Sequence, residues 1–345
     1  MRPNTTTSKI VDAFPSMHVV VAGDLMLDRY WVGEVDRISP EAPVPVVRKT
    51  RAFGVPGGAA NTACNVAALG GRVTLFGLTG RDEAGAELRA MLGDRGIDCS
   101  PLSMHPHRPT TVKLRIVAHD QQVVRIDDED TAPLDSGLGE AAARRASRIM
   151  HRMHAVVVSD YAKGFVTEAL VHGLIAAAQR CGKPVVIDPK GAGFERYRGA
   201  TIIKPNRKEL ALLTGLPARN HEETVPAARQ LLRLTGAAAI VVTEGKDGMT
   251  LLQPGTPEEH FPSFAREVYD VTGAGDTALA ALAIALAAGA RLSDAVWLAN
   301  LAAGLAVGES GTVAVTRERL VRAMAGLRRP RTASFSSHEQ DSQAR

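Results

Sequence analysis

The stretch Asp270-Val271-Thr272-Gly273-Ala274-Gly275-Asp276 runs directly into an alanine-rich segment, residues 277–288, that predicts a buried helix. The two glycines and the alanine between them allow successive backbone N–H groups to turn toward one point at the start of that helix. These first N–H groups have no partner inside a helix, and the helix dipole makes the local potential positive. The stretch therefore predicts a phosphate cradle formed by Gly273, Ala274 and Gly275.

Asp276 lies at the edge of this predicted cradle. Its carboxylate could accept a proton from a hydroxyl while the neighbouring amides stabilise charge on a phosphoryl group. A simpler interpretation is that Asp276 caps the helix and that the glycines only permit a turn. The catalytic interpretation requires that Asp276 face a ligand and that the three amides be free of internal bonding.

Short β-branched segments alternate with helix-like segments along most of the chain. This alternation is typical of an α/β protein, and we expect a doubly wound, mostly parallel sheet flanked by helices. The expected strands are 18–22, 73–77, 155–159, 184–187, 201–203 and 238–243. Helices are expected at 59–69, 168–180, 226–234 and 277–288.

Two segments break this alternation and predict a small β lid, at about 32–50 and 111–127. The prolines of the first segment suit an edge strand or an extended arm. The second segment predicts a hairpin that turns near His119-Asp120. The two-residue period of a strand places Lys113, Arg115 and Arg125 together, opposite the apolar side chains. These cations could bind an anion or simply solvate an exposed sheet.

Candidate sugar contacts lie near the first strand. The pair Gly57-Gly58 opens a helix, where the missing side chains let a ligand approach, and Asn61 could bond hydroxyls as donor and acceptor. Asp24 and Asp28 follow the strand, where carboxylates in open α/β sheets point into the ligand crevice. The alternatives are a packed joint for the glycines and a turn or helix cap for each aspartate.

Two more motifs follow predicted strands: Asn206-Arg207-Lys208-Glu209 and Thr243-Glu244-Gly245. Asn206 and Glu209 are placed to organise nucleotide phosphates and Mg²⁺, which keeps several waters and is often held by a carboxylate at one remove. Each could equally be an ordinary cap. The sequence contains no G-x-x-x-x-G-K-[ST] motif and no G-x-G-x-x-G after the first strand, which argues against P-loop and dinucleotide sites.

Composition limits the functional class. The chain has 345 residues with 41 Lys+Arg against 37 Asp+Glu, and no aromatic residues interleave with the arginines at 328–331, so nucleic-acid binding is not expected. Cys64, Cys99 and Cys181 lack disulfide or zinc spacing and fit a reducing compartment. The most apolar run, 278–288, is too short to cross a membrane, so we expect a cytoplasmic protein.

Four motifs together resemble the ribokinase-like (PfkB) carbohydrate kinases: G-G…N-x-A at 57–63, N-x-x-E at 206–209, T-x-G at 243–245 and D-x-T-G-A-G-D at 270–276. The resemblance covers about residues 17–325. It implies a kinase domain over 17–327, which we expect after a flexible N-terminus at 1–16 and before a disordered tail at 328–345. It also implies ATP and Mg²⁺ as cofactors, with a monovalent cation such as K⁺ near Asp270 and the loop at 302–312.

Segments 23–31, 37–46 and 159–164 are similar to the branch of that family that phosphorylates heptose 7-phosphate. This resemblance implies ATP-dependent phosphorylation of the C1 hydroxyl of D-glycero-β-D-manno-heptose 7-phosphate to the 1,7-bisphosphate, toward ADP-heptose and lipopolysaccharide. Alternatives are a kinase for another sugar or sugar phosphate and a non-catalytic sugar-phosphate sensor. The chain has no H-x-G-H nucleotidyl-transfer motif, so we expect only the kinase step and a separate adenylyltransferase as a candidate partner.

The resemblance also assigns roles residue by residue. It makes Asp276 the base and Gly273, Ala274 and Gly275 the anion hole. The ATP site comprises Asn206, Arg207, Lys208, Glu209, Thr243, Gly245 and Asn300, with Glu209 holding Mg²⁺ through water. The sugar site comprises Asp24, Asp28, Gly57, Gly58, Asn61, Lys113, Arg115, Arg125, Asp160, Lys163 and Lys190. The lid cations would meet the distal phosphate of the sugar, and the lid would pair two chains into a homodimer.

Overall fold

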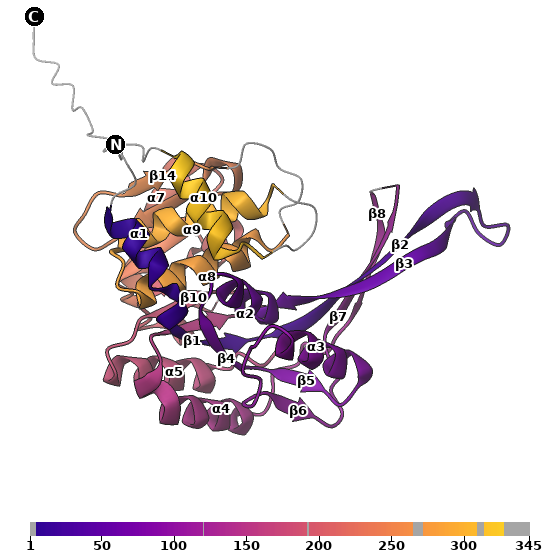
Figure 1. Cartoon of the computed structure of the whole chain (residues 1–345), viewed down its shortest axis with the longest axis horizontal. Helices are drawn as coiled ribbons and strands as arrows, with labels where there is room; N and C mark the ends of the chain where they lie inside the picture. The colour runs from indigo at the N-terminus through magenta and orange to yellow at the C-terminus, as the bar shows by residue number, and fades with distance from the viewer. Residues whose placement is uncertain (1–4, 120, 192, 265–271, 309–313, 328–345) are drawn as a thin grey trace, which may run out of the picture.

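The computed structural model describes residues 5–119, 121–191, 193–264, 272–308 and 314–327. Its centre is an eight-stranded sheet (Figure 1). In spatial order the strands are β14 (Glu259–Phe261), β13 (Met249–Leu252), β12 (Ala239–Thr243), β11 (Ile202–Ile203), β10 (Val185–Asp188), β9 (Ala155–Ser159), β1 (His18–Gly23) and β4 (Arg72–Phe76). Strands β12 to β4 in this order are parallel, and β13 and β14 are antiparallel. The expected doubly wound, mostly parallel sheet is confirmed.

Helices cover both faces of this sheet, and alternate residues of each central strand are buried against one face or the other. Val19 and Val21 of β1 pack in one core, whereas Val20 and Ala22 pack in the other. The first core includes α1 (Thr5–Asp12), α2 (Ala59–Ala68), α3 (Glu83–Gly93), α8 (Ala274–Ala287), α9 (Leu292–Ala306) and α10 (Arg317–Gly326). The second includes α4 (Ser136–Ile149), α5 (Glu168–Arg180), α6 (Arg207–Thr214) and α7 (His221–Thr235).

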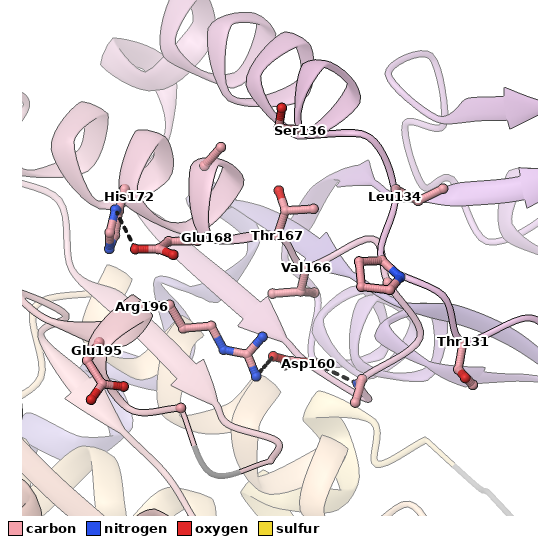
Figure 2. Close-up of a pocket in the computed structure, with 15 residues that line it drawn as sticks. Thr131, Leu134, Ser136, Asp160, Val166, Thr167, Glu168, His172, Glu195 and Arg196 are labelled. Atoms are coloured by element: carbon pink, nitrogen blue, oxygen red, sulfur yellow. Dashed lines mark hydrogen bonds and ion pairs between the residues drawn. The ribbon is translucent and has the colours of Figure 1, made fainter.

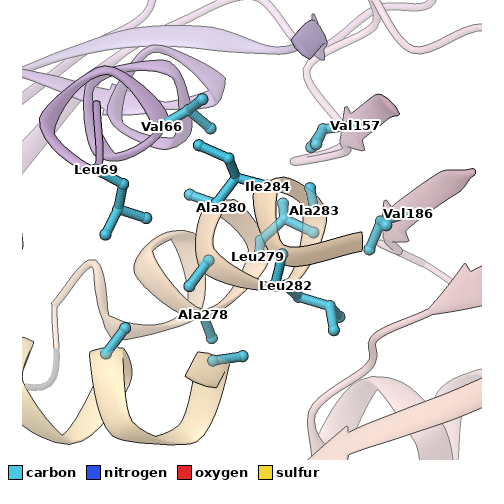
Figure 3. Packing of buried hydrophobic residues seen from close by; sticks show 14 of the residues in the cluster. Val66, Leu69, Val157, Val186, Ala278, Leu279, Ala280, Leu282, Ala283 and Ile284 are labelled. Atoms are coloured by element: carbon cyan, nitrogen blue, oxygen red, sulfur yellow. The ribbon is translucent and has the colours of Figure 1, made fainter. Parts of the chain in front are cut away.

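Helix α8 is the central helix of the first core. Residues 278–285 are 0% exposed, and Figure 3 shows Ile284 beside Val66 of α2, with Val157 and Val186 of the sheet nearby. Its many alanines allow neighbouring helices to approach closely. Burial of each larger side chain, such as Leu279, contributes about 1.5–3 kcal/mol. This packing fixes the N-terminal end of α8 near the carboxyl ends of the parallel strands.

A second sheet, with strand order β3-β2-β7-β8, extends away from the main body as the lid (Figure 1). Its strands are β2 (Leu25–Ile38), β3 (Pro45–Gly58), β7 (Val112–Ala118) and β8 (Gln121–Asp128). The β7–β8 hairpin is confirmed, since Leu114 pairs with Ile126 and Arg115 pairs with Arg125. Basic and apolar side chains therefore occupy opposite faces, as the two-residue period predicts. Val124 and Ile126 are 44% and 50% exposed.

The first lid segment differs from the expectation of one edge strand or arm over 32–49. It forms the turn and the adjoining parts of a long β2–β3 hairpin, in which β3 is an edge strand and β2 lies between β3 and β7 over Leu27–Gly33. The prolines fall at the turn and at the start of β3, where a missing N–H does not interrupt the ladder. The lid therefore extends beyond the expected 32–50, from Leu25 to Gly58.

The N-terminal segment also differs from the expectation where the structure describes it. Instead of a flexible segment over 1–16, α1 and a 3₁₀ turn at Phe14–Ser16 pack on the main body. Val11 and Phe14 are 0% exposed, and this apolar burial explains the fold of a segment whose polar residues are more numerous. The tail at 328–345 and residues 1–4 lie outside the described residues.

Helix α7 begins at His221 rather than near Pro226, because the Asn220 side chain caps it by accepting from the Glu223 amide.

The remaining strands are β5 (Leu78–Gly80) and β6 (Ser103–His105), which form a separate two-stranded sheet. The remaining 3₁₀ turns are Met150–Arg152, Glu195–Tyr197 and Gly245–Asp247. The three cysteines are unpaired. Over the described ranges, no helix has the length and apolarity to cross a membrane.

Candidate active site

The N-terminus of α8 begins at Gly273, which has a φ of 83° and no side chain to cap the helix. Ala274, Gly275 and Asp276 are the first three residues of the helix, where N–H groups lack partners within the helix. Ala274 and Gly275 line a cavity of about 410 Å³. This end of α8 therefore presents backbone donors and positive dipole potential to a cavity, as an anion site requires.

Asp276 turns to the other side of the helix end, where it is 4% exposed. Tyr161 donates to its Oδ1 at 2.8 Å and Asn61 to its Oδ2 at 2.8 Å. The Thr62 hydroxyl is 3.1 Å from Oδ1. These donors come from α2 and from the loop after β9, so Asp276 is not the N-cap considered in the alternative interpretation. Burial raises the pKa of Asp276, and the hydrogen bonds and the charge of Lys204 oppose that rise.

Lys204 and Asp188 complete this site, although no sequence motif indicated them. Lys204 Nζ lies 3.1 Å from Asp188 Oδ2, and the same Nζ is 4.0 Å from where a Cβ on Gly275 would be. Lys204 is only 2% exposed. Burial raises the pKa of Asp188 to about 7, with Lys204 acting in the opposite direction. Both residues end or follow parallel strands, a position that could have indicated them.

Asp24 organises the loop that follows β9. Its Oδ2 accepts from the backbone amides of Tyr161 and Lys163, at 2.9 and 3.0 Å, and its Oδ1 accepts from the Phe165 amide at 3.0 Å. Asp24 is 2% exposed and borders a small cavity together with Arg108. Its carboxylate thus holds in place the loop that carries Tyr161, and most of its acceptor capacity is used for this purpose.

Asp28 lies against the glycine pair that opens α2. Its Oδ1 accepts from Arg115 at 2.6 Å, which links the lid strands β2 and β7. A Cβ on Gly57 would lie 2.4 Å from Asp28 Oδ2, so this carboxylate requires glycine at position 57. Gly58 has a φ of 58°, which side-chain-bearing residues rarely adopt. The structure therefore brings Asp28, Gly57, Gly58 and Arg115 together.

The other lid cations have acidic partners. Lys113 Nζ is 2.8 Å from Asp127 and 3.1 Å from Glu129, while Lys163 Nζ is 2.6 Å from Glu129. Arg125 donates to Asp127 at 2.8 Å. Lys113 and Lys163 thus meet at one carboxylate although they are fifty residues apart in sequence. An anion that binds here has to share or displace Asp127 and Glu129.

The 410 Å³ cavity gathers residues from distant parts of the sequence. Of the expected ATP contacts, Asn206, Thr243, Gly245 and Asn300 line it, next to Ala274 and Gly275. Asn206 also caps α6, and Asn300 donates to the carbonyls of residues 261 and 262, at 3.2 and 2.8 Å. The cavity extends from the anion site at α8 toward the antiparallel edge of the sheet.

Three expected ATP contacts are not in the lining of that cavity, as far as the described residues define it. Lys208 is exposed, and Arg207 pairs with Glu244 and Asp247. Glu209 accepts from Lys190 at 2.8 Å through Oε1 and from the Asn206 amide at 2.9 Å through Oε2. Because both of its oxygens have partners, Glu209 fits Mg²⁺ better through water than by direct ligation.

Asp160 faces a different and larger cavity of about 850 Å³ (Figure 2). Its carboxylate pairs with Arg196 at 3.1 Å and accepts from Tyr197 at 2.7 Å and from the Ala162 amide at 2.7 Å. Burial raises the pKa of Asp160 to about 6. The structure therefore separates Asp160 from the Asp276 carboxylate, although Tyr161 of the same loop reaches Asp276. Of the expected cation site, Asp270 and residues 309–312 lie outside the described residues, whereas residues 302–306 are the end of α9 and not a loop.

Comparison with known proteins agrees with this arrangement. "Bifunctional protein HldE" of Rhodospirillum rubrum is 45% identical over 94% of this chain, and the protein of the same name from Methylococcus capsulatus is 47% identical over 96%. The chain spans 65% and 68% of those two proteins. Arabidopsis thaliana ribokinase, complexed with ribose and ATP, superposes with a TM-score of 0.71 at 22% identity, over 89% of this chain and 98% of its own.

Phosphofructokinase-2 from Escherichia coli in complex with potassium superposes with a TM-score of 0.70 at 21% identity, over 90% of this chain and 98% of its own. These structural similarities establish the ribokinase-like fold. Residues 16–319 match the model of the family described as "pfkB family carbohydrate kinase". These residues include the lid, both glycine motifs and the start of α8. The chain therefore belongs to the pfkB family of carbohydrate kinases.

Proposed function

We propose that this kinase transfers the γ-phosphoryl group of ATP to the C1 hydroxyl of D-glycero-β-D-manno-heptose 7-phosphate and forms the 1,7-bisphosphate. The observation that carries phosphoryl transfer is the buried Asp276 carboxylate beside the uncapped N–H groups of Ala274 and Gly275. Support for the heptose comes from the segments at 23–31, 37–46 and 159–164 and from identities of 45–47% to proteins named HldE.

In this proposal Asp276 accepts the proton of the attacking hydroxyl. The α8 N–H groups and Lys204 stabilise negative charge on the transferred group, since phosphoryl transfer is catalysed mainly by positioning and electrostatics. Tyr161, Asn61 and Thr62 hold the carboxylate in one orientation through bonds of 2.8–3.1 Å. At least one of these donors yields its place to the sugar hydroxyl when substrate binds.

The 410 Å³ cavity would hold the nucleotide, with Asn206, Thr243, Gly245 and Asn300 on its walls and its phosphates toward Gly275. Mg²⁺ would neutralise charge on these phosphates. Glu209 would hold it through water, since its oxygens already have partners in Lys190 and Asn206. Arg207 and Lys208 would act from outside the cavity.

The sugar would lie between Asp276 and the lid, near Asp28, Gly57 and Gly58. Its distal phosphate would meet Lys113, Arg115, Arg125 and Lys163, which converge on the carboxylates of Asp28, Asp127 and Glu129. An incoming phosphate would take over part of these ion pairs. A sugar without a distal phosphate would leave these ion pairs intact and would gain no binding energy from the cations. This argument favours a sugar phosphate as the substrate.

The test compares wild type with Asp276→Asn on heptose 7-phosphate, with ADP release followed in a coupled assay and the product phosphate placed by phosphorus NMR. We expect kcat to fall about 10²–10⁴-fold in Asp276→Asn, the range typical of a lost general base. The matched control is Asp294→Asn. It alters another buried carboxylate, which lies on α9 and pairs with Arg291. Equal turnover by both variants and wild type would remove the proposed base. Turnover with hexose phosphates alone would reassign the substrate.

We also propose a homodimer in which the exposed apolar face of β8, at Val124 and Ile126, covers the same face of a second chain. Light scattering of Ile126→Glu against wild type would test it, with a monomeric wild type as the contrary result.

A separate adenylyltransferase that acts on the product, and K⁺ near Asp270, complete the proposal. Because E. coli phosphofructokinase-2, which shares this fold, has been crystallised in complex with potassium, K⁺ is the first ion to test.

A further inference from the structure

A cluster of two histidines and a glutamate lies at the antiparallel edge of the main sheet, and the kinase proposal does not use it. His221 is the first residue of α7, Glu244 directly follows β12, and His260 is on β14. One ligand atom from each lies within 4.8 Å of the other two. Sequence spacing does not reveal this cluster, because its members are far apart along the chain and form no metal-binding motif.

The nitrogen atoms of both histidines point toward one carboxylate oxygen. His221 Nδ1 is 3.4 Å and His260 Nδ1 is 3.9 Å from Glu244 Oε1. Donor atoms around a tetrahedral ion with bonds of ~2.0–2.1 Å are about 3.3 Å apart. The two measured separations are therefore within reach of small side-chain rotations.

The surroundings of Glu244 prepare its carboxylate for a cation. Its side chain is 0% exposed, and Arg207 pairs with the other oxygen, Oε2, which orients the carboxylate and leaves Oε1 toward the histidines. Thr250, which is adjacent to His260 across the β13–β14 pair, donates its hydroxyl to Glu244 Oε1 and lies 3.0 Å from His260 Nδ1 and 3.3 Å from His221 Nδ1, so an ion bound at Oε1 would displace this hydrogen bond or take the hydroxyl oxygen as a further ligand.

The site is accessible from solvent. The side chains of His221 and His260 are 37% and 29% exposed, although the carboxylate between them is buried. An ion could therefore enter from the histidine side and keep a water as a further ligand. Two imidazoles with one carboxylate suit Zn²⁺ and related transition ions, whereas Mg²⁺ and Ca²⁺ prefer oxygen ligands alone.

We propose that His221, Glu244 and His260 form a binding site for a divalent transition-metal ion of the Zn²⁺ class. The ion ties the start of α7 and the edge strand β14 to the turn at Gly245–Asp247. Gly245 and Lys246 of that turn line the 410 Å³ cavity, so the ion stabilises one wall of that cavity. This inference does not depend on the sugar substrate or on catalysis.

The experiment uses the full chain without a histidine tag, freed of metal by chelation and then titrated with Zn²⁺ by calorimetry. Wild type is expected to bind one Zn²⁺ per chain with a Zn²⁺-dependent rise in Tm. His221→Gln and His260→Gln should each weaken binding at least tenfold, and the double variant should lose it. His172→Gln is the matched control, because His172 also faces a glutamate, Glu168 at 3.8 Å, but on the exposed surface of α5.

Circular dichroism in chelator establishes whether each variant is folded. Co²⁺ bound to wild type gives a readout that needs no variant, since four- or five-coordinate nitrogen and oxygen ligation produces strong visible absorption. The proposal is overturned if wild type binds no Zn²⁺, if the folded double variant binds it as wild type does, or if His172→Gln causes the loss instead. Weak cobalt absorption typical of six water or oxygen ligands would overturn it as well.

Discussion

The hydroxyl of Tyr161 is one of the donors that lower the proton affinity of the proposed base, and its removal tests the site without altering the carboxylate. Tyr161 donates to Asp276 Oδ1 at 2.8 Å and belongs to the loop that Asp24 holds through backbone amides. A donor to a carboxylate favours its charged form and lowers its pKa, in opposition to the burial that raises it. Tyr161→Phe should therefore raise the pKa of Asp276 further.

The size of this effect follows from the bond that is lost. A hydrogen bond to a charged group is worth about 1.5–3 kcal/mol, and one pKa unit corresponds to about 1.4 kcal/mol. The acidic limb of the rate profile should move upward by about one to two pH units. At a pH below that limb, kcat should fall about 10- to 100-fold, while turnover at high pH should approach that of wild type.

The assay measures kcat with saturating ATP and sugar phosphate across the pH range. Tyr197→Phe is the matched control, because Tyr197 also donates to a buried carboxylate, Asp160 at 2.7 Å, on the other side of the same loop. It should lower stability and leave the acidic limb in place. An unshifted limb in Tyr161→Phe, or the same shift in both variants, would refute the assignment of Asp276 as the titrating base.

Two further predictions concern packing and pH. Gly57→Ala should reduce stability by about 1–3 kcal/mol and raise the KM for sugar, since its Cβ would lie 2.4 Å from Asp28 Oδ2. Gly93→Ala, whose Cβ meets nothing within 4 Å, should be neutral in urea denaturation, and equal losses in both would contradict the clash. The pKa of Asp160 is raised by burial to about 6, so the folded state holds this proton more tightly than the unfolded state. The contribution of Asp160 to the free energy of unfolding should therefore decrease by at most about 3 kcal/mol from pH 4 to pH 6. This decrease, measured by urea denaturation, should be absent in Asp160→Asn. If the free energies of unfolding of wild type and Asp160→Asn differed by the same amount at every pH, this prediction would be contradicted.

The central sheet could be predicted from sequence because its strands are short apolar runs buried on both faces. Residues 155–159 form β9 with the expected bounds, and residues 168–180 form α5 with the expected bounds. The N-terminal helix could not be predicted, because only a few apolar residues, among them Val11 and Phe14, anchor it. Their partners come from parts of the chain that sequence periodicity does not relate to them.

The candidate site was partly predictable for a similar reason. Gly273 to Asp276 form one local motif, so their geometry at the start of α8 follows from residues that are adjacent in sequence. Lys204 and Tyr161 act at Asp276 through tertiary contacts, across 72 and 115 residues, and no spacing rule connects them. The partners of the lid cations were missed because only the folded sheet brings them together: Asp28 belongs to β2, Asp127 to the end of β8, and Glu129 follows β8.

The loop after β9 links these separate observations. Asp24, directly after β1, accepts hydrogen bonds from three backbone amides of this loop. The side chains of the loop point to two different sides. Tyr161 and Lys163 reach Asp276 and the lid carboxylate Glu129, whereas Asp160 faces the larger cavity. A shift of this one loop would therefore change the environment of the base and the ion pairs of the lid together. Lid closure over a sugar phosphate, by drawing Lys163 toward the phosphate, would therefore adjust the position of the Tyr161 hydroxyl against Asp276 Oδ1.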